Sequence, residues 1–188
     1  MHGASLRDIA AAADVNIATV HYHHGAKAEL YRAVFQRLAA QEQAVIDSFI
    51  VRADDVTLHD RTALRALLEE LVDTVIAMTL EYPEAPRLWV RRWLEHPAEA
   101  DGIETEFSLP LYRSLHSLLE RARVAGAIDR ADFDLDLFLQ SFSWLLYGYF
   151  LGGPLDPDQG RGDPHDPIRL ATFKNFLHTY LCRMLDLE

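Results

Sequence analysis

Residues 5–35 read SLRDIAAAADVNIATVHYHHGAKAELYRAVF, and this stretch decides the fold of the N-terminal region. Ser5 followed by Asp8 resembles a capping box, which predicts a short helix of about two turns. Its inner face is expected to carry Leu6, Ile9, Ala10 and Ala13. Asp14 comes next, and Asp is one of the few residues besides Gly that tolerate a left-handed backbone. A short helix followed by a tight turn at Asp14 is therefore predicted.

A second short helix is predicted directly after this turn. Asn16 is a favourable N-cap, and Gly25 ends the helix. With Val20 committed to the core, the remaining face carries small or hydrogen-bonding groups at Ala18, Thr19, Tyr22 and His23. Such groups can contact base edges and phosphates. The two helices and their turn form a helix-turn-helix, and Lys27 can meet a phosphate at the start of the next helix.

The residues of this motif resemble the DNA-binding signature of the TetR family of bacterial transcriptional regulators. The matching run is Ile9-Ala10-x-x-Ala13-x-Val15-Asn16-x-Ala18-Thr19-Val20-x-Tyr22-His23-x-Gly25-x-Lys27-x-x-Leu30. The resemblance implies a recognition helix that carries Asn16, Ile17, Ala18, Thr19, His21, Tyr22 and His23. It also implies that Ser5 and Lys27 contact phosphates on either side.

Three features depart from the family pattern. Asp14 stands where the family usually has Gly, and His24 stands where it usually has a core aromatic residue. The family also has a full helix before the helix-turn-helix, whereas only four residues precede Ser5 here. We therefore expect that the first helix is missing through truncation or a misplaced start. The apolar side chains that would lose cover are Leu6, Ile9, Val15 and Val20, and exposing two of them costs a few kcal/mol at ~25 cal/mol per Å².

The rest of the chain shows helical periodicity, so the fold is predicted to be all-α. Apolar residues recur three and four apart in the segments 29–49, 61–82, 104–124 and 167–185. Breaks are expected at Pro83, Pro86, Pro97, Gly102, Gly126 and a Gly- and Pro-rich loop over 152–167. No strand pattern competes. A helix-turn-helix head (residues 1–45) is thus followed by a helical-bundle ligand-binding and dimerisation domain (residues 46–188).

The segment 137–155 carries no charged residue and approaches the ~20 apolar residues of a membrane span. A span is not expected, because polar residues interrupt the segment and Gly152, Gly153 and Pro154 stop the helix. We expect this helix and the last one to form a four-helix dimer interface with a second copy. The alternative is core packing within one subunit. The interface residues predicted are Phe138, Ser141, Leu145, Phe173, Phe176, Leu177, Tyr180, Leu181 and Met184.

Aromatic and basic side chains in the larger domain are candidates for a pocket that binds a small hydrophobic or aromatic effector. The candidate residues are Met78, Trp89, Arg92, Trp93, Tyr112, His116, Trp144 and Tyr147. Trp residues at helical spacing are also typical of plain core packing, and that alternative stays open.

No catalytic, metal or cofactor site is predicted. Among His21, His23 and His24, only His21 and His24 have the spacing that metal ligands need on a helix, and no other ligand completes a shell. Cys182 lies on the apolar face of the last helix without a neighbouring His in the sequence, which favours a buried structural thiol. No phosphate-binding loop or nucleophile motif occurs, so an enzyme is not expected.

The composition is acidic, with 18 Lys and Arg against 29 Asp and Glu and a net charge of −11. Such a balance argues against nucleic acid as a partner. The acidity lies in the body, however, because residues 1–49 hold 4 basic and 5 acidic residues. A single cysteine and an N-terminus without a secretion pattern favour the cytoplasm.

These features predict a homodimeric transcriptional regulator that binds an operator in double-stranded DNA. It would be a repressor, released when a small molecule changes the separation of the two recognition helices. The alternative is a helical ligand-binding or protein-interaction module that has lost DNA binding with its first helix.

Overall fold

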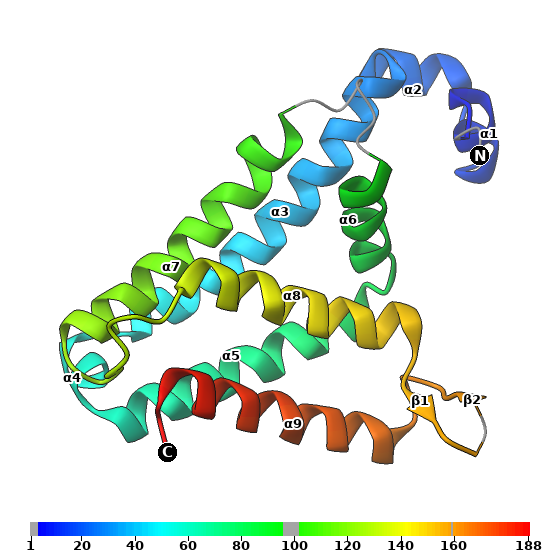
Figure 1. Cartoon of the computed structure of the whole chain (residues 1–188). Coiled ribbons are helices and arrows are strands. Elements are labelled where there is room, and N and C mark those ends of the chain that lie inside the picture. Colours follow the sequence, from blue (N-terminus) through cyan, green and yellow to red (C-terminus); the bar gives the residue numbers. More distant parts are fainter. Residues whose placement is uncertain (1–3, 96–101, 159) are drawn as a thin grey trace.

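The computed structural model describes residues 4–95, 102–158 and 160–188, which are helical almost throughout (Figure 1). In chain order the elements are α1 (Leu6–Ala12), α2 (Ile17–His24), α3 (Lys27–Arg52), α4 (Asp55–His59), α5 (Arg61–Glu81), α6 (Glu84–Glu95), the π-helix η2 (Glu104–Ser108), α7 (Leu109–Val124), α8 (Leu135–Gly152), the strands β1 (Leu155–Asp156) and β2 (Gly160–Arg161), and α9 (Pro167–Leu185). The all-α prediction is confirmed.

The two N-terminal helices begin where their caps predict. The backbone N–H of Asp8 donates to Ser5 Oγ at 3.2 Å, and the backbone N–H of Ser5 donates to Asp8 Oδ2 at 2.8 Å. At the start of α2 the backbone N–H of Ala18 donates to Asn16 Oδ1 at 2.8 Å. Each bond satisfies a backbone group that a helix end leaves without a partner. Local sequence alone therefore sets both helix starts.

Two residues with positive φ make the sharp turns of this region. Asp14, between α1 and α2, has a φ of 53°, as its left-handed tolerance predicts. Gly25, between α2 and α3, has a φ of 64°. A Cβ at Gly25 would lie 1.7 Å from Glu29 Oε2, and Glu29 accepts a 2.7 Å hydrogen bond from the N–H of Ala26. The positive φ thus favours glycine at this corner, and a Cβ would also displace the Glu29 carboxyl group.

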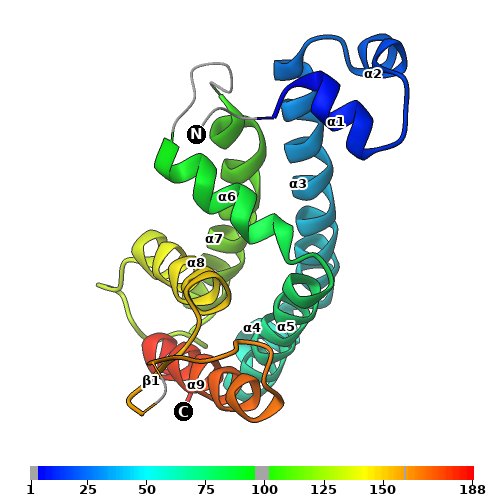
Figure 2. The same cartoon turned by 90° about the vertical axis from the view of Figure 1, so that its right-hand side faces the viewer.

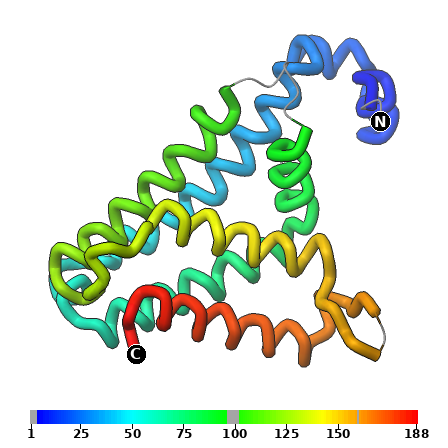
Figure 3. The backbone as a smooth tube through the Cα atoms, in the orientation of Figure 1, coloured from blue at the N-terminus to red at the C-terminus, as the bar shows by residue number. Residues whose placement is uncertain are grey.

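The helix α3 connects the helix-turn-helix to the rest of the molecule. In Figure 1 it runs from the N-terminal helices down beside α7, against which it packs. The predicted domain boundary at residue 45 falls inside this continuous helix. The head and the body therefore share α3, and Figure 3 shows the N-terminal helices near one end of it and α4 at the other.

The body buries one large apolar core between α3, α5, α7, α8 and α9. The buried apolar side chains that α5 contributes are Leu64, Leu67, Leu68, Leu71, Val72 and Ile76. Seen from the side in Figure 2, the helix-turn-helix lies at one end of the molecule and α9 at the other. The helix-turn-helix is therefore separated from most of the large apolar core.

A second, smaller core lies where α6 meets the head-proximal half of α3. It consists of Phe35, Ala39, Trp89 and Ile103, and the rings of Phe35 and Trp89 are 4.6 Å apart. The helix α6 contains Pro86, which was expected to break the chain. Pro86 lies in the first turn of α6, where its missing N–H costs no intrahelical bond.

Two further sequence expectations need correction. The helix predicted over 104–124 begins as the π-helix η2, and α7 proper starts next to Pro110, which cannot donate to the α-helical ladder. The loop predicted over 152–167 contains a two-stranded antiparallel hairpin that pairs Leu155 with Arg161 and Asp156 with Gly160. The Arg169 guanidinium donates to the Asp156 carboxylate and anchors this hairpin to α9. Such a long-range contact is not visible in local periodicity.

A search of the described helices finds no candidate that is both long and apolar enough to span a membrane. Gly152 and Gly153 end α8 where the sequence predicts.

Candidate nucleic-acid interface and ligand pocket

The recognition helix α2 presents most of its surface to solvent. Its one buried residue is Val20, whereas the ring of Tyr22 is 85% exposed. Of the residues predicted to contact DNA, Ile17 is partly buried, and the exposed ones are Ser5, Asn16, Ala18, Thr19, His21, Tyr22, His23 and Lys27. Val20 is buried, although the absence of a first helix was expected to expose it. Val15 is 43% exposed, as that expectation predicts.

The hydrogen bonds within the head divide these residues into two groups. Asn16 is used as the N-cap, and Nδ1 of His21 lies 3.1 Å from the carbonyl oxygen of Gly25. Thr19, Tyr22 and His23 have no such local role, and the rings of Tyr22 and His23 meet edge to face at 5.1 Å. Among the described residues of the head, these three exposed side chains are therefore not used in helix capping.

Phosphate-binding charge in the head is limited. The Ser5 hydroxyl donates to Asp8 Oδ2 at 2.6 Å, so a phosphate would compete with this carboxylate. The hydrogen bonds from Ser5 lower the pKa of Asp8 below its ordinary value, and the negative charge is therefore retained. Lys27 is exposed at the N-terminus of α3, where the free backbone N–H groups also favour an anion. Arg7 on α1 is exposed as well, and the sequence interpretation did not include it.

His24 is exposed rather than packed in the core of the head. Its replacement of the usual aromatic residue therefore places a polar ring in water, which removes the cost of burying it. In the part of the chain that the structure describes, no group of three His, Cys, Asp or Glu side chains could hold a metal ion.

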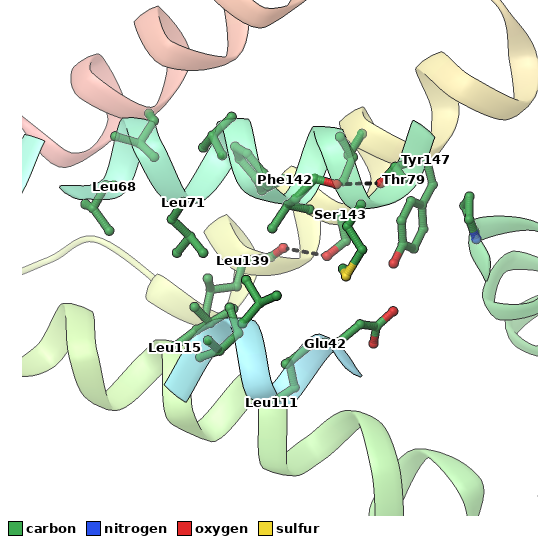
Figure 4. Close-up of a pocket in the computed structure, with 18 of the residues that line it drawn as sticks. Glu42, Leu68, Leu71, Thr79, Leu111, Leu115, Leu139, Phe142, Ser143 and Tyr147 are labelled. Carbon is green, nitrogen blue, oxygen red and sulfur yellow. Dashed lines mark hydrogen bonds between the residues drawn. The ribbon is translucent and has the colours of Figure 1, made fainter. Parts of the chain in front are cut away.

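The body contains an apolar cavity of about 150 Å³ between α3, α5, α7 and α8, with contributions from α6 and α9 (Figure 4). Most of the side chains that line it are apolar. Figure 4 shows Leu68 and Leu71 of α5, Leu111 and Leu115 of α7, and Phe142 of α8 around it. Thr79 and Ser143 also line the cavity, but their hydroxyls donate to the carbonyl oxygens of Val75 and Leu139 in their own helices.

Glu42 of α3 is the acidic residue on this cavity wall. The Trp89 indole N–H donates to Glu42 Oε1 at 3.0 Å. Burial raises the pKa of Glu42 from 4.5 to about 7, and the Trp89 hydrogen bond offsets part of this rise. The cavity therefore combines an apolar wall with one carboxyl group that changes its protonation near neutral pH.

The sequence interpretation missed Glu42, although a signal was present. Leu38, Glu42, Val45 and Phe49 lie four, three and four residues apart, so Glu42 occupies a position in the apolar stripe of the segment 29–49. A charged residue at such a position faces the core, where ionisable groups are uncommon. Periodicity alone indicates the burial, but not the cavity beside it.

The structure distributes the predicted pocket residues over three places. Met78 and Tyr147 line the cavity. An open groove on the outer surface is lined by Trp93, Tyr112, His116 and Trp144. Trp89 is buried in the smaller core, and Arg92 is held by Glu104, with Nε 2.7 Å from Oε1 and Nη2 2.8 Å from Oε2. Trp89 and Arg92 therefore pack against other parts of the protein and do not line the cavity.

The residues predicted for the dimer interface fall into a buried group and a group that reaches the surface. Phe138, Leu177 and Leu181 are buried within one chain, because they face the core that α8 and α9 share with α5. Their side chains are therefore not accessible to a second copy of the chain. Phe176 is exposed, and the partly buried members are Ser141, Leu145, Phe173, Tyr180 and Met184. The Ser141 and Tyr180 hydroxyls, 2.8 Å apart, join α8 to α9.

Comparison with known proteins gives one match. Residues 1–34 match the family model described as bacterial regulatory proteins, tetR family. Neither the curated proteins nor the solved structures provide a match to this chain. The matched residues include α1, α2 and the first turns of α3, which are the elements of the helix-turn-helix described above. The match therefore covers the DNA-binding motif, and through residues 1–34 the chain is similar to the bacterial regulatory proteins of the tetR family.

Proposed function

We propose that the protein is a homodimeric, cytoplasmic repressor that leaves its operator when a small molecule enters the cavity. The observation that carries the proposal is the continuity of α3. Lys27 at its start lies beside the recognition helix, and Glu42 lies on the cavity wall about 22 Å further along the same helix. Any shift of α3 at the cavity therefore also moves the head.

Contacts of α6 support this coupling. Trp89 connects the cavity to the head-proximal part of α3, because its N–H bonds Glu42 while its ring packs on Phe35. The Phe35 ring in turn lies 4.9 Å from that of Tyr31, one helical turn nearer to the head. A ligand that binds the Glu42 carboxyl group and shifts it would therefore also move Trp89 and change its packing on Phe35.

The dimer surface that we propose follows the outer face of α8 and continues onto α9. Its α8 residues lie four and three apart and are Leu137, Ser141, Trp144, Gly148 and Leu151. Three of them are exposed large apolar residues, and the other two are small enough to let a second helix approach closely. On α9 the exposed Phe176 stacks on Tyr180, which bonds Ser141, so both helices contribute to one surface.

Binding to operator DNA is the direct test. Fluorescence anisotropy with DNA from upstream of the gene should show salt-sensitive binding, because Lys27 and Arg7 neutralise phosphates. Lys27→Ala should lower the slope of log K against log[salt] by about 1 for each subunit. Arg183→Ala removes an exposed cation at the opposite end of the chain and should leave the slope unchanged. A chain that binds this DNA at no salt concentration would contradict the proposal.

Release by a ligand is tested separately. A thermal-shift screen of small apolar and aromatic compounds should find molecules that raise the melting temperature. The same molecules should lower the operator affinity of the dimer. If they raise the melting temperature but leave the operator affinity unchanged, the cavity is not coupled to the head.

A further inference from the structure

The Glu42 carboxyl group has one oxygen in use and one available. Oε1 accepts the hydrogen bond from Trp89 at 3.0 Å. Among the described residues no basic side chain pairs with Glu42, and no donor is found for Oε2. Figure 4 shows the carboxyl group at the edge of the cavity, near the residues of α8. An acceptor is therefore presented to whatever occupies the cavity.

The Tyr147 hydroxyl is directed toward the same part of the cavity, as Figure 4 shows. Within the described part of the chain this hydroxyl has no hydrogen-bond partner. Burial and the neighbouring Glu42 charge raise the pKa of Tyr147, which keeps the phenol uncharged. Two oxygen atoms from α3 and α8 thus face a space whose walls are mostly apolar.

The size of the space limits its occupant. A cavity of about 150 Å³ with apolar walls holds a molecule about as large as benzene. A carboxylate at the edge of such a space is costly without a positive charge or a strong donor beside it. An anionic ligand would increase that cost, whereas an ammonium group would offset it.

We propose that the cavity binds a small apolar molecule that carries one protonated amine. The ammonium group donates to Glu42 Oε2, and the Tyr147 oxygen accepts a second hydrogen bond. The hydrocarbon part of the ligand packs on the leucines of α5 and α7. This assignment rests on the proposed function, in which a small molecule enters the cavity, and it gives the chemical class of that molecule.

The pH dependence of binding follows from the groups that face Glu42. Tyr112 of α7 and Tyr147 of α8 lie close enough to interact with its charge, Tyr82 at the end of α5 lines the same cavity, and the pKa of each lies above its ordinary value of 10. Trp89 of α6 carries no charge, and Arg92 of the same helix is paired with Glu104. Glu42, with a pKa of about 7, is therefore the group that titrates near neutral pH. An amine should bind more tightly as Glu42 ionises.

Benzylamine and benzyl alcohol test the assignment, because the two probes have the same ring and differ in charge. Isothermal titration of the full chain at about pH 8 should give an affinity for benzylamine about tenfold higher than for the alcohol. Between about pH 6 and about pH 8 the benzylamine affinity should rise, while that of the alcohol should stay flat. Equal affinities, a flat benzylamine profile or no binding of benzylamine would overturn the proposal.

Two variants locate the charge that the amine contacts. Glu42→Gln keeps an oxygen for the Trp89 N–H and should abolish the preference for benzylamine. Asp47→Asn removes a negative charge from the exposed side of the same helix and should retain the preference for benzylamine. If Glu42→Gln keeps the preference, the assignment is wrong. Because the titrations contain no DNA, a chain that binds benzylamine but no operator contradicts only the proposed function.

Discussion

Glu42 lies in an environment that its chemistry does not favour. Its side chain lies on the wall of an apolar cavity, and its hydrogen bond comes from a neutral indole N–H. Its pKa is therefore raised from 4.5 to about 7. The folded chain keeps a proton on Glu42 between these two pH values, where the unfolded chain has released it. Stability must accordingly fall as pH rises through this window and level off above it.

The variant Glu42→Gln tests this linkage. Ionised Glu42 costs the folded chain about 3 kcal/mol relative to the unfolded chain, and Gln cannot ionise. Urea unfolding should show the variant to be more stable than the parent by up to about 3 kcal/mol at about pH 8. Near pH 4.5 the difference should be small, since Glu42 is then neutral in the folded chain and only half ionised in the unfolded chain. Parallel stability profiles for the two proteins would contradict the expectation, and Asp47→Asn serves as the control.

The contribution of Tyr22 to DNA binding can be tested by removing its side chain. Its side chain is exposed on α2, so Tyr22→Ala should remove the proposed DNA contact without opening the core. Operator affinity should fall at least about tenfold, because a good base contact contributes about 1–3 kcal/mol in each subunit. The melting temperature should stay near that of the parent. Leu155→Ala, at an exposed position on the distant hairpin, should leave DNA binding unchanged, and equal losses for both variants would remove Tyr22 from the interface.

At the scale of elements, the relation of α1 to α2 depends on a turn of very few residues. Asp14 takes the left-handed conformation with a φ of 53°, which Gly adopts without strain and a β-branched residue does not. The helix starts on either side are fixed by Ser5 and Asn16, so the backbone at Asp14 decides the angle between the helices. The presentation of the recognition helix therefore depends on this one conformation.

Substitutions at Asp14 should separate the effect of backbone conformation from that of the side chain. Asp14→Gly should keep or slightly raise the stability of the head, whereas Asp14→Val should cost roughly 1–2 kcal/mol. Hydrogen exchange is the suitable measurement, because it reports local opening of α1 and α2. Protection of the amides in α5 should be unchanged in both variants. Equal protection of α1 and α2 in the Gly and Val variants would show that the turn does not need its left-handed residue.

For the whole molecule, the central question is how two heads are placed for DNA. Successive major grooves on one side of the duplex are about 34 Å apart, so two recognition helices must be held at a matching distance. The exposed stripe on α8 and the adjoining Phe176 of α9 lie in the body, away from the helix-turn-helix. Contacts made there would set the spacing of the heads through α3. A small change within the body would then remove both heads from register together.

Phe176→Asp should weaken this dimer. Phe176 is 50% exposed, so a carboxylate there is solvated in the monomer but must be buried in the dimer. Sedimentation equilibrium should show a dissociation constant raised at least about tenfold, with the unfolding profile of the monomer retained. Val56→Asp makes the same change on α4, at a residue that is 75% exposed. If both variants remain dimeric to the same extent, the interface lies elsewhere.

Much of the fold could be predicted from local sequence. The caps at Ser5 and Asn16, the left-handed Asp14 and the end of α2 at Gly25 all depend on residues within one or two turns of each other. The apolar stripe of α5 likewise follows from a repeat in one segment. The hairpin after α8 was not predicted, because Arg169 of α9 anchors it. Local patterns identify helices and turns but not contacts between segments that are distant in the chain.

The sequence by itself determined the helix-turn-helix and the all-α class, because capping, turn conformation and a 3.6-residue period act over short distances. Only the tertiary structure decided which side chains meet. It placed Trp89 on Glu42, forty-seven residues away, and moved Trp93 and Trp144 to an outer groove. It also turned Phe138, Leu177 and Leu181 into the core. Burial on one side of a helix follows from periodicity, but the partner on that side depends on how all the helices pack.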